Sequence, residues 1–292
     1  MLEKSVLIAA LARDCNNSIL RNIPKIEKLR KEFKESHVVI IENDSKDGTK
    51  ETLKRWEKES IGVEAIMNDY GTITIPEQSK DIKNPGTSML RISKMAKYRN
   101  MYMDYARNAD FNIDYLIVID IDIEDFSVEG IIESINNAPN DWGGLFANGF
   151  KFYNKYLFVF YDTFAFIPYK SKYIDLTINE NITNAHKMTN KVKYNSYIKC
   201  FSAFGGIGIY KWDIISDLYY KADKNNRSKV NETICEHIPF NIEIINKGYM
   251  NYISSRMKVI YGKPTFKESI FFTFLPPFLI LLIYKIIGRE LD

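Results

Sequence analysis

The stretch Tyr115-Leu116-Ile117-Val118-Ile119-Asp120-Ile121-Asp122 decides the fold. Its uninterrupted apolar run is typical of a strand in a parallel sheet that is covered on both faces. Such a strand has no structural use for two carboxylates at its carboxyl end, because like charges repel and their desolvation is costly without a cation. Mg²⁺ and Mn²⁺ bind carboxylate oxygens and keep coordination sites for phosphates. Asp120 and Asp122 therefore predict a site for a metal and a diphosphate; the alternative is a strand that ends in a polar loop.

Strand-like and helix-like segments alternate on the amino-terminal side of this stretch. The predicted elements are strands over 5–12, 37–41 and 63–67 and helices over about 17–34, 49–59 and 88–107. This alternation predicts an α/β fold with a doubly wound, mostly parallel sheet. Ligands of such sheets bind outside the carboxyl ends of the strands, so the chemistry is expected just after Ala12, Ile41 and Ile119.

The second half of the chain is less regular. It contains an aromatic stretch over 150–169, a polar segment over 171–195 that we expect to be mobile, and a glycine-rich turn at 205–208. We find no linker between the two halves and no internal repeat. We therefore expect one domain over 1–266.

Composition excludes several classes of protein. A hydrophobic fraction of 46% is enough for a sizeable core, so the chain is not disordered as a whole. Forty basic and 37 acidic residues leave a net charge of +3, which is too small for a nucleic-acid partner. Three cysteines without a Cys-x-x-Cys pair argue against a disulfide framework or structural zinc, and fit a reducing, cytoplasmic compartment.

The residues near the carboxyl end are unusually apolar. Residues 270–284 carry no charge, yet a membrane-spanning helix needs about 20 apolar residues and Pro276-Pro277 would break one. We expect 267–292 to be a membrane-associating tail, with peripheral contact through 270–287 at the inner face of the membrane. The alternative is a tail that docks on the protein's own core or on a partner chain.

A second predicted strand also ends in acidic residues, in the run 42–49, Glu-Asn-Asp-Ser-Lys-Asp-Gly-Thr. Turn and helix-cap chemistry accounts for the last three residues but not for Glu42, whose carboxylate can accept hydrogen bonds from a base or ribose. Arg13-Asp14 ends the first strand in the same way. Arg99, on the long predicted helix, either pairs with ligand phosphates or is an ordinary surface arginine.

In order and spacing, the run 42–49, Arg99-Asn100 and Asp120-Ile121-Asp122 resemble the nucleotide-binding half of GT-A glycosyltransferases of the family 2 type. The resemblance implies a nucleoside diphosphate sugar donor and Mn²⁺ or Mg²⁺ as cofactor. It places Glu42 near the base, Asp120 near the ribose and Asp122 on the metal. The residues expected to bind the nucleotide sugar are Arg13, Glu42, Asp44, Arg99, Asp120, Gly205 and Gly206.

Motifs of the second half are similar to those of GT-A enzymes and of fungal capsule-associated mannosyltransferases. They are Tyr161-Asp162-Thr163-Phe164, the glycine-containing run 203–211, and Cys235-Glu236-His237 before a helix that ends at Gly248. The resemblance divides the domain into a nucleotide-binding half, 1–125, and an acceptor and catalytic half, 126–266.

Glu236-His237 stands where family 2-type enzymes place Glu-Asp, whose second residue is the catalytic base. His237 is either that base or a metal ligand, which would leave Glu236 as the base; a buried structural imidazole is the third interpretation. Asp162, among aromatic residues, either hydrogen-bonds sugar hydroxyls or is a polar residue at a strand edge. Gly205 and Gly206 allow backbone to approach the sugar, or form a turn with unusual φ angles.

These residues predict a metal-dependent glycosyltransferase that moves a sugar from a nucleoside diphosphate sugar to a glycan or lipid-linked saccharide in surface polysaccharide synthesis. A sugar-1-phosphate nucleotidyltransferase is an alternative, but those enzymes have a glycine-rich loop after the first strand, and residues 12–17 contain no glycine. An inactive nucleotide-sugar-binding module is the other alternative, against which the intact Asp120 and Asp122 argue.

Overall fold

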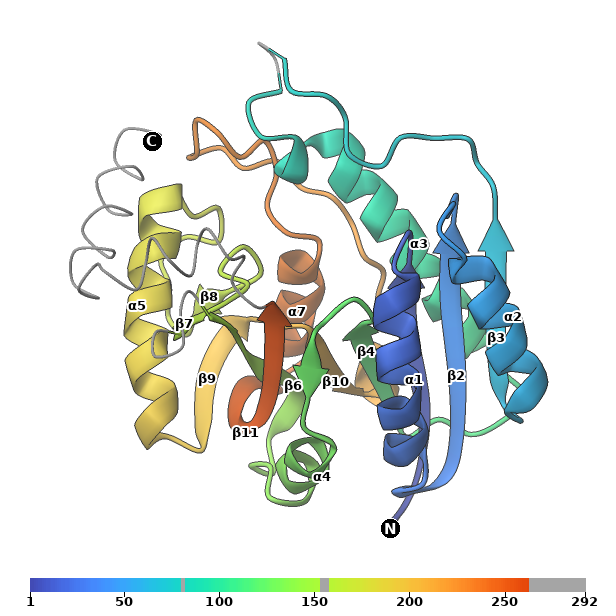
Figure 1. Ribbon diagram of the computed structural model, residues 1–292. Helices are drawn as coiled ribbons and strands as arrows, with labels where there is room; N and C mark the ends of the chain where they lie inside the picture. The colour runs from blue at the N-terminus through green and yellow to red at the C-terminus, as the bar shows by residue number, and fades with distance from the viewer. Residues whose placement is uncertain (80–81, 153–157, 263–292) are drawn as a thin grey trace.

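Helices cover both faces of one mixed sheet in the computed structural model, which describes residues 1–79, 82–152 and 158–262 (Figure 1). The predicted α/β fold is confirmed. The strand order is β3-β2-β1-β4-β10-β6-β11-β9-β8, with β5 paired to β11 and β7 paired to β6. One sheet therefore runs through both halves of the chain.

The first half has the predicted βαβ arrangement. Its elements are β1 (Leu2–Ala12), α1 (Asn16–Arg30), β2 (Phe33–Asn43), α2 (Thr49–Glu59), β3 (Val63–Asn68), the 3-10 helix η1 (Pro85–Thr87), α3 (Met89–Arg107) and β4 (Tyr115–Asp120). β1 pairs in parallel with β2 and β4, and β2 with β3. The predicted helix over 17–34 is too long, because Phe33 already belongs to β2 and is buried in the core.

The second half adds mostly antiparallel strands. Its elements are β5 (Asp125–Phe126), α4 (Val128–Asn136), β6 (Trp142–Phe152), β7 (Phe158–Phe160), β8 (Ile167–Pro168), α5 (Ile178–Tyr194), β9 (Tyr197–Ser202), β10 (Ile207–Lys211), α6 (Trp212–Ile215), α7 (His237–Asn246) and β11 (Met250–Gly262). β10 lies antiparallel between β4 and β6, whereas β6 and β11 are parallel. β10 thereby joins the second half to the strand that carries Asp120.

The prediction of a mobile segment over 171–195 is wrong, because most of it forms α5. Thr177 and Glu180 form a capping box, in which each side chain accepts a hydrogen bond from the other residue's backbone N–H. Ala185, Met188 and Val192 then bury one face of the helix at helical spacing. The Thr-x-x-Glu signature of a helix start is present in the sequence, but the polar composition of the segment favoured the prediction of a loop.

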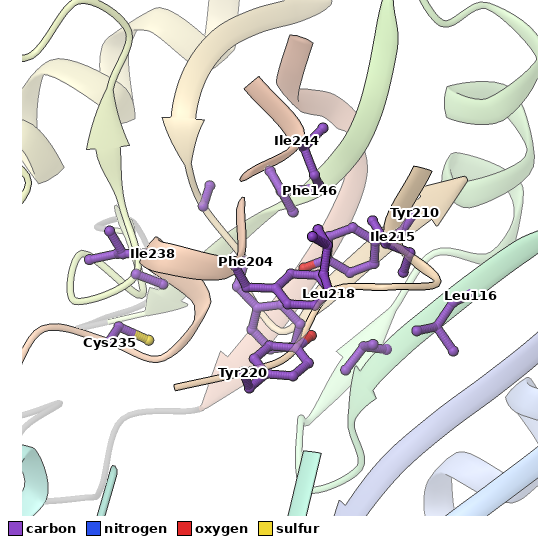
Figure 2. Packing of buried hydrophobic residues seen from close by; sticks show 14 of the residues in the cluster. Leu116, Phe146, Phe204, Tyr210, Ile215, Leu218, Tyr220, Cys235, Ile238 and Ile244 are labelled. Carbon is purple, nitrogen blue, oxygen red and sulfur yellow. The ribbon is translucent and has the colours of Figure 1, made fainter. Parts of the chain in front are cut away.

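Alternate residues of β4 belong to two hydrophobic clusters, one on each face of the sheet. Leu116 and Val118 pack with α3 and α7, and Ile117 and Ile119 pack with α1, α2 and α4. Burying an aliphatic side chain contributes about 1.5 to 3 kcal/mol. In Figure 2 the first cluster extends from Leu116 to Cys235, so the core supports the segment that carries Glu236 and His237.

The predicted tail over 267–292, with its membrane contact through 270–287, lies outside the described residues and stays a prediction. Within the described ranges, no helix combines the length and apolar character needed to cross a membrane.

Candidate active site

A cavity of about 610 Å³ opens at the carboxyl ends of β1 and β4, where the sequence places the chemistry. Its wall also includes residues from α3, from the loop after β7 and from the start of α7. The predicted site residues that line it are Arg13, Arg99, Asp120, Asp122, Asp162, Glu236 and His237. The fold thus brings motifs from the two halves of the chain to one place.

Glu42 and Asp44 lie behind this wall rather than on it. Glu42 is fully buried; its Oε1 accepts a hydrogen bond from the Ser45 backbone N–H at 2.8 Å, and its Oε2 has no partner among the described residues. Asp44 has a φ of 55° and accepts a hydrogen bond from the Gly71 N–H at 2.7 Å. Both side chains therefore shape the loop after β2, and their contact with a nucleotide stays a prediction.

Gly205 and Gly206 form the turn before β10, with φ angles of 64° and 91°. A Cβ atom on Gly205 would lie 2.4 Å from the Ala147 carbonyl oxygen, so only glycine fits there. The Gly205 N–H donates to Asp162 Oδ2 at 2.9 Å, and the Gly206 carbonyl accepts from the Asp120 N–H at 2.9 Å. The turn thus positions Asp162 and Asp120 in the cavity wall, although neither glycine lines the cavity itself.

Arg99 connects the motifs of the two halves. Its Nε donates to Glu236 Oε1 at 2.9 Å, and its Nη2 lies 3.8 Å from Asp120 Oδ1. Arg99 and Glu236 are almost fully buried, so each needs the other to compensate its charge. The Tyr261 hydroxyl donates to the second oxygen of Asp120. Asp120 is therefore held from α3 and from the end of β11.

Desolvation makes the carboxyl groups of Asp120, Asp122 and Asp162 hard to ionise. It raises the pKa of Asp120 to about 6, against the opposing charge of Arg99, and the pKa of Asp162 to about 7. Desolvation at the cavity wall also raises the pKa of Asp122, although the residue is exposed, and the charges of Arg21 and Arg91 oppose this rise. A divalent cation would stabilise the ionised forms, so these groups fit a metal site.

The protein side chains alone do not complete a metal site. Within the described ranges, no three His, Cys, Asp or Glu side chains are grouped closely enough to hold an ion. Mg²⁺ and Mn²⁺ sites with one or two carboxylates take their remaining ligands from water and substrate phosphates. Asp120 and Asp122 suit that kind of site.

His237 begins α7 and is only 2% exposed. Its ring stacks on Phe204 at 4.1 Å, and neither ring nitrogen has a hydrogen-bond partner among the described residues. Burial, together with the charge of Arg99, holds the pKa of His237 well below its ordinary value, so the imidazole is neutral. The role of His237 as base, metal ligand or structural imidazole therefore stays a prediction.

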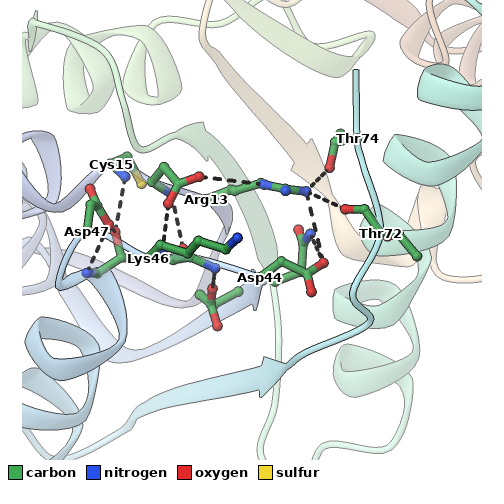
Figure 3. A network of polar contacts seen from close by, with 12 residues as sticks. Arg13, Cys15, Asp44, Lys46, Asp47, Thr72 and Thr74 are labelled. Atoms are coloured by element: carbon green, nitrogen blue, oxygen red, sulfur yellow. Dashed lines mark hydrogen bonds and ion pairs between the residues drawn. The ribbon is translucent and has the colours of Figure 1, made fainter. Parts of the chain in front are cut away.

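Figure 3 shows how Arg13 and the acidic loop after β2 are joined. Arg13 Nη1 donates to the Thr72 carbonyl at 3.2 Å and to the Thr74 hydroxyl, and lies 4.0 Å from Asp44 Oδ2. Its Nε lies 3.7 Å from Asp14. Arg13 therefore ties the end of β1 to the segment after β3 at the cavity wall.

Sequence reasoning missed several residues of the site. Asn22 Nδ2 donates to the Ile121 and Ile123 carbonyls at 2.9 and 2.8 Å, and Arg21 donates to the latter at 2.9 Å. They hold the loop that carries Asp122. Asn22 had a signal, because it interrupts the apolar face of α1. Arg91 also lines the cavity.

The mixed sheet thus carries a cavity at the carboxyl ends of its strands, with two aspartates in the cavity wall. Residues 5–239 match the family described as Cryptococcal mannosyltransferase 1. The chain belongs to this family, which confirms the resemblance noted in the sequence. No curated protein matches the chain.

Solved structures with a similar fold share little sequence with this chain. Mannosyltransferase PcManGT from Pyrobaculum calidifontis, in complex with GDP-Man and Mn²⁺, is 10% identical over 89% of this chain and 57% of its own, with a TM-score of 0.49. TarS from S. aureus, in complex with UDP-GlcNAc, is 12% identical over 89% of this chain and 59% of its own, with a TM-score of 0.47. This chain thus spans less than two thirds of either structure.

Proposed function

We propose that the chain transfers a sugar, with mannose as the first candidate, from a nucleoside diphosphate sugar to a glycan or lipid-linked saccharide. The observation that carries the proposal is the gathering of Asp120 and Asp122 with Glu236 and His237 in one cavity at the strand ends. Family membership supports a glycosyltransferase over a nucleotidyltransferase.

Asp120 and Asp122 would hold Mn²⁺ or Mg²⁺, which neutralises charge on the departing diphosphate. Arg99 and Tyr261 orient Asp120, and Asn22 fixes the loop of Asp122. These contacts hold the two carboxylates in place before a ligand arrives, which lowers the free energy needed to order the site.

Glu236 and His237 have different surroundings, because Glu236 pairs with Arg99 whereas the His237 ring stacks on Phe204, and we assign them different roles. The lowered pKa of His237 makes its neutral imidazole a weak proton acceptor, with one nitrogen that carries a lone pair for a metal or donor and one that carries a proton. We assign it to the metal or donor side, and Glu236, placed by Arg99, to the acceptor side as the base. Asp162, held by the Gly205 N–H, is assigned to sugar hydroxyls.

Participation in surface polysaccharide synthesis at the inner face of the membrane is the wider part of the proposal. It is supported by the family and by the apolar composition of 270–287. Pelleting with anionic vesicles, compared between the full chain and a chain ending at Lys267, tests the membrane contact. Equal partitioning of the two chains contradicts it.

The function is tested by a thermal-shift screen of GDP, UDP and other nucleoside diphosphates, with and without Mn²⁺. We expect one diphosphate to raise Tm with Mn²⁺ and Asp122→Asn to remove most of that rise. Asp125→Asn, on β5 outside the cavity, is the matched control. Metal-independent binding that Asp122→Asn leaves unchanged contradicts the metal site, and binding without donor hydrolysis or transfer favours a binding module.

A further inference from the structure

Two arginines of α3 line the same cavity but differ in how the protein engages them. All three guanidinium nitrogens of Arg99 face protein groups: Nε donates to Glu236, Nη1 lies 3.5 Å from the Tyr102 hydroxyl, and Nη2 lies 3.8 Å from Asp120. Arg99 is also only 3% exposed. A ligand anion that recruited Arg99 would have to displace a buried carboxylate.

Arg91 is much less engaged. Its Nη1 donates to the Gly86 carbonyl at 2.6 Å, and its Nε is buried without a hydrogen-bond partner in the described part of the chain. No carboxylate forms an ion pair with Arg91 in the described part of the chain. Its charge nevertheless lowers the pKa of Asp122, which also lines the cavity. The donor capacity of a cavity-lining guanidinium is therefore mostly unused.

The position of Arg91 in α3 is also electrostatically unfavourable. It lies in the first turn of the helix, where its backbone N–H is capped by the Ser88 side chain at 3.3 Å. The helix dipole favours anions at this end and disfavours a cation. A bound anion would be attracted both by the helix terminus and by the guanidinium, so the otherwise unfavourable placement suits an anion site.

We propose that Arg91, rather than Arg99, is the arginine that binds the diphosphate of the donor, and that Arg99 is a positioning residue for Glu236 and Asp120. The inference rests on the proposed function. Arg91 would contact phosphate oxygens of the donor, since guanidinium donors pair well with phosphate. Arg99 would keep the two carboxylates in place without touching the diphosphate.

The test is titration calorimetry of the wild-type chain, Arg91→Ala and Arg91→Lys with the nucleoside diphosphate found by the screen and with the matching nucleoside, both with Mn²⁺. We expect Arg91→Ala to weaken diphosphate binding about ten- to a hundredfold and nucleoside binding less than threefold. Arg91→Lys should recover part of the loss. Lys97→Ala, an exposed cation of the same helix outside the cavity, should match the wild type.

Arg99→Lys separates the two arginines, because it retains the charge but loses the geometry that holds Glu236 and Asp120. We expect a lower transfer rate with diphosphate affinity within about threefold of wild type. Wild-type diphosphate affinity in Arg91→Ala, or equal losses for nucleoside and diphosphate, overturns the assignment of Arg91. If the wild-type chain binds no nucleoside diphosphate, the proposed function itself fails, which is a different result.

Discussion

The two sides of the cavity are built in different ways. On the β1 and β2 side, the partly exposed Arg13 contacts Asp14, the buried Asp44 and the segment at Thr72 to Thr74, all within the first half of the chain. On the β4 and α7 side, the buried Arg99 contacts Glu236 and Asp120. Arg99 and Glu236 lie more than 100 residues apart in the sequence. Exposed local networks add little stability, whereas a buried network depends on every partner.

The largest expected effect comes from breaking the buried side. Arg99→Met leaves Glu236 buried without its cation, so we expect the free energy of unfolding to fall by about 3 to 5 kcal/mol. Arg13→Met is the matched variant on the other side. Arg13 is 30% exposed and lies 3.7 and 4.0 Å from its two carboxylates, so we expect a loss below about 1 kcal/mol. Urea unfolding of both variants measures the difference.

A double variant makes this comparison sharper. Glu236→Leu combined with Arg99→Met removes both charges, so part of the lost stability should return. If Arg99→Met and Arg13→Met lower the free energy of unfolding equally, the buried network is no more important for stability than the more exposed one.

The pH dependence of stability is the next effect in size. Burial raises the pKa of Asp162 from its ordinary value of 3.8 to about 7, so the native state holds a proton that the unfolded chain releases as pH rises above about 4. The contribution of Asp162 to stability therefore falls between pH 4 and pH 7 and is constant above pH 7. Each pKa unit corresponds to about 1.4 kcal/mol, and partial exposure of Asp162 makes about 3 kcal/mol an upper value.

Asp162→Asn tests this effect, because asparagine resembles the protonated aspartate and can still accept from the Gly205 N–H. In metal-free buffer, the stability of Asp162→Asn relative to wild type should rise from pH 5 to pH 7.5. A difference that does not change with pH shows that Asp162 is ionised in the native state across this range.

The smallest expected effect compares two glycines with nearly the same φ. Gly205 and Gly71 have φ angles of 64° and 62°. A Cβ atom on Gly205 would clash with the Ala147 carbonyl, whereas one on Gly71 would point into open space. Both alanine variants incur the cost of a left-handed residue, and Gly205→Ala adds a steric clash. We expect Gly205→Ala to be less stable than Gly71→Ala by about 1 to 2 kcal/mol in urea unfolding; equal stability would mean that the turn before β10 shifts freely.

The sequence predicted local motifs better than contacts between distant segments. Strand and helix periodicity located β1 to β4, and acidic strand ends located Asp120 and Asp122, because these signals lie within a few neighbouring residues. The pairing of Arg99 with Glu236 could not be read in this way, since it depends on how α3 and α7 meet around the sheet.

The remaining misses have the same physical cause. Tyr261 lies in a strand without a distinguishing motif, and only the fold brings its hydroxyl to Asp120. Arg91 was detectable in principle as a cation in the first turn of a helix.

The contact of Tyr261 with Asp120 also has a consequence for protein synthesis. When β4 leaves the ribosome, one of its edges can pair with β1, which is already made. The other edge has no partner until β10 is synthesised. Asp120 then lacks the Tyr261 hydroxyl until the last residues of β11 emerge. A nascent chain therefore cannot assemble the complete carboxylate site early, and the amino-terminal half is not an independent module that could be transplanted with its site intact.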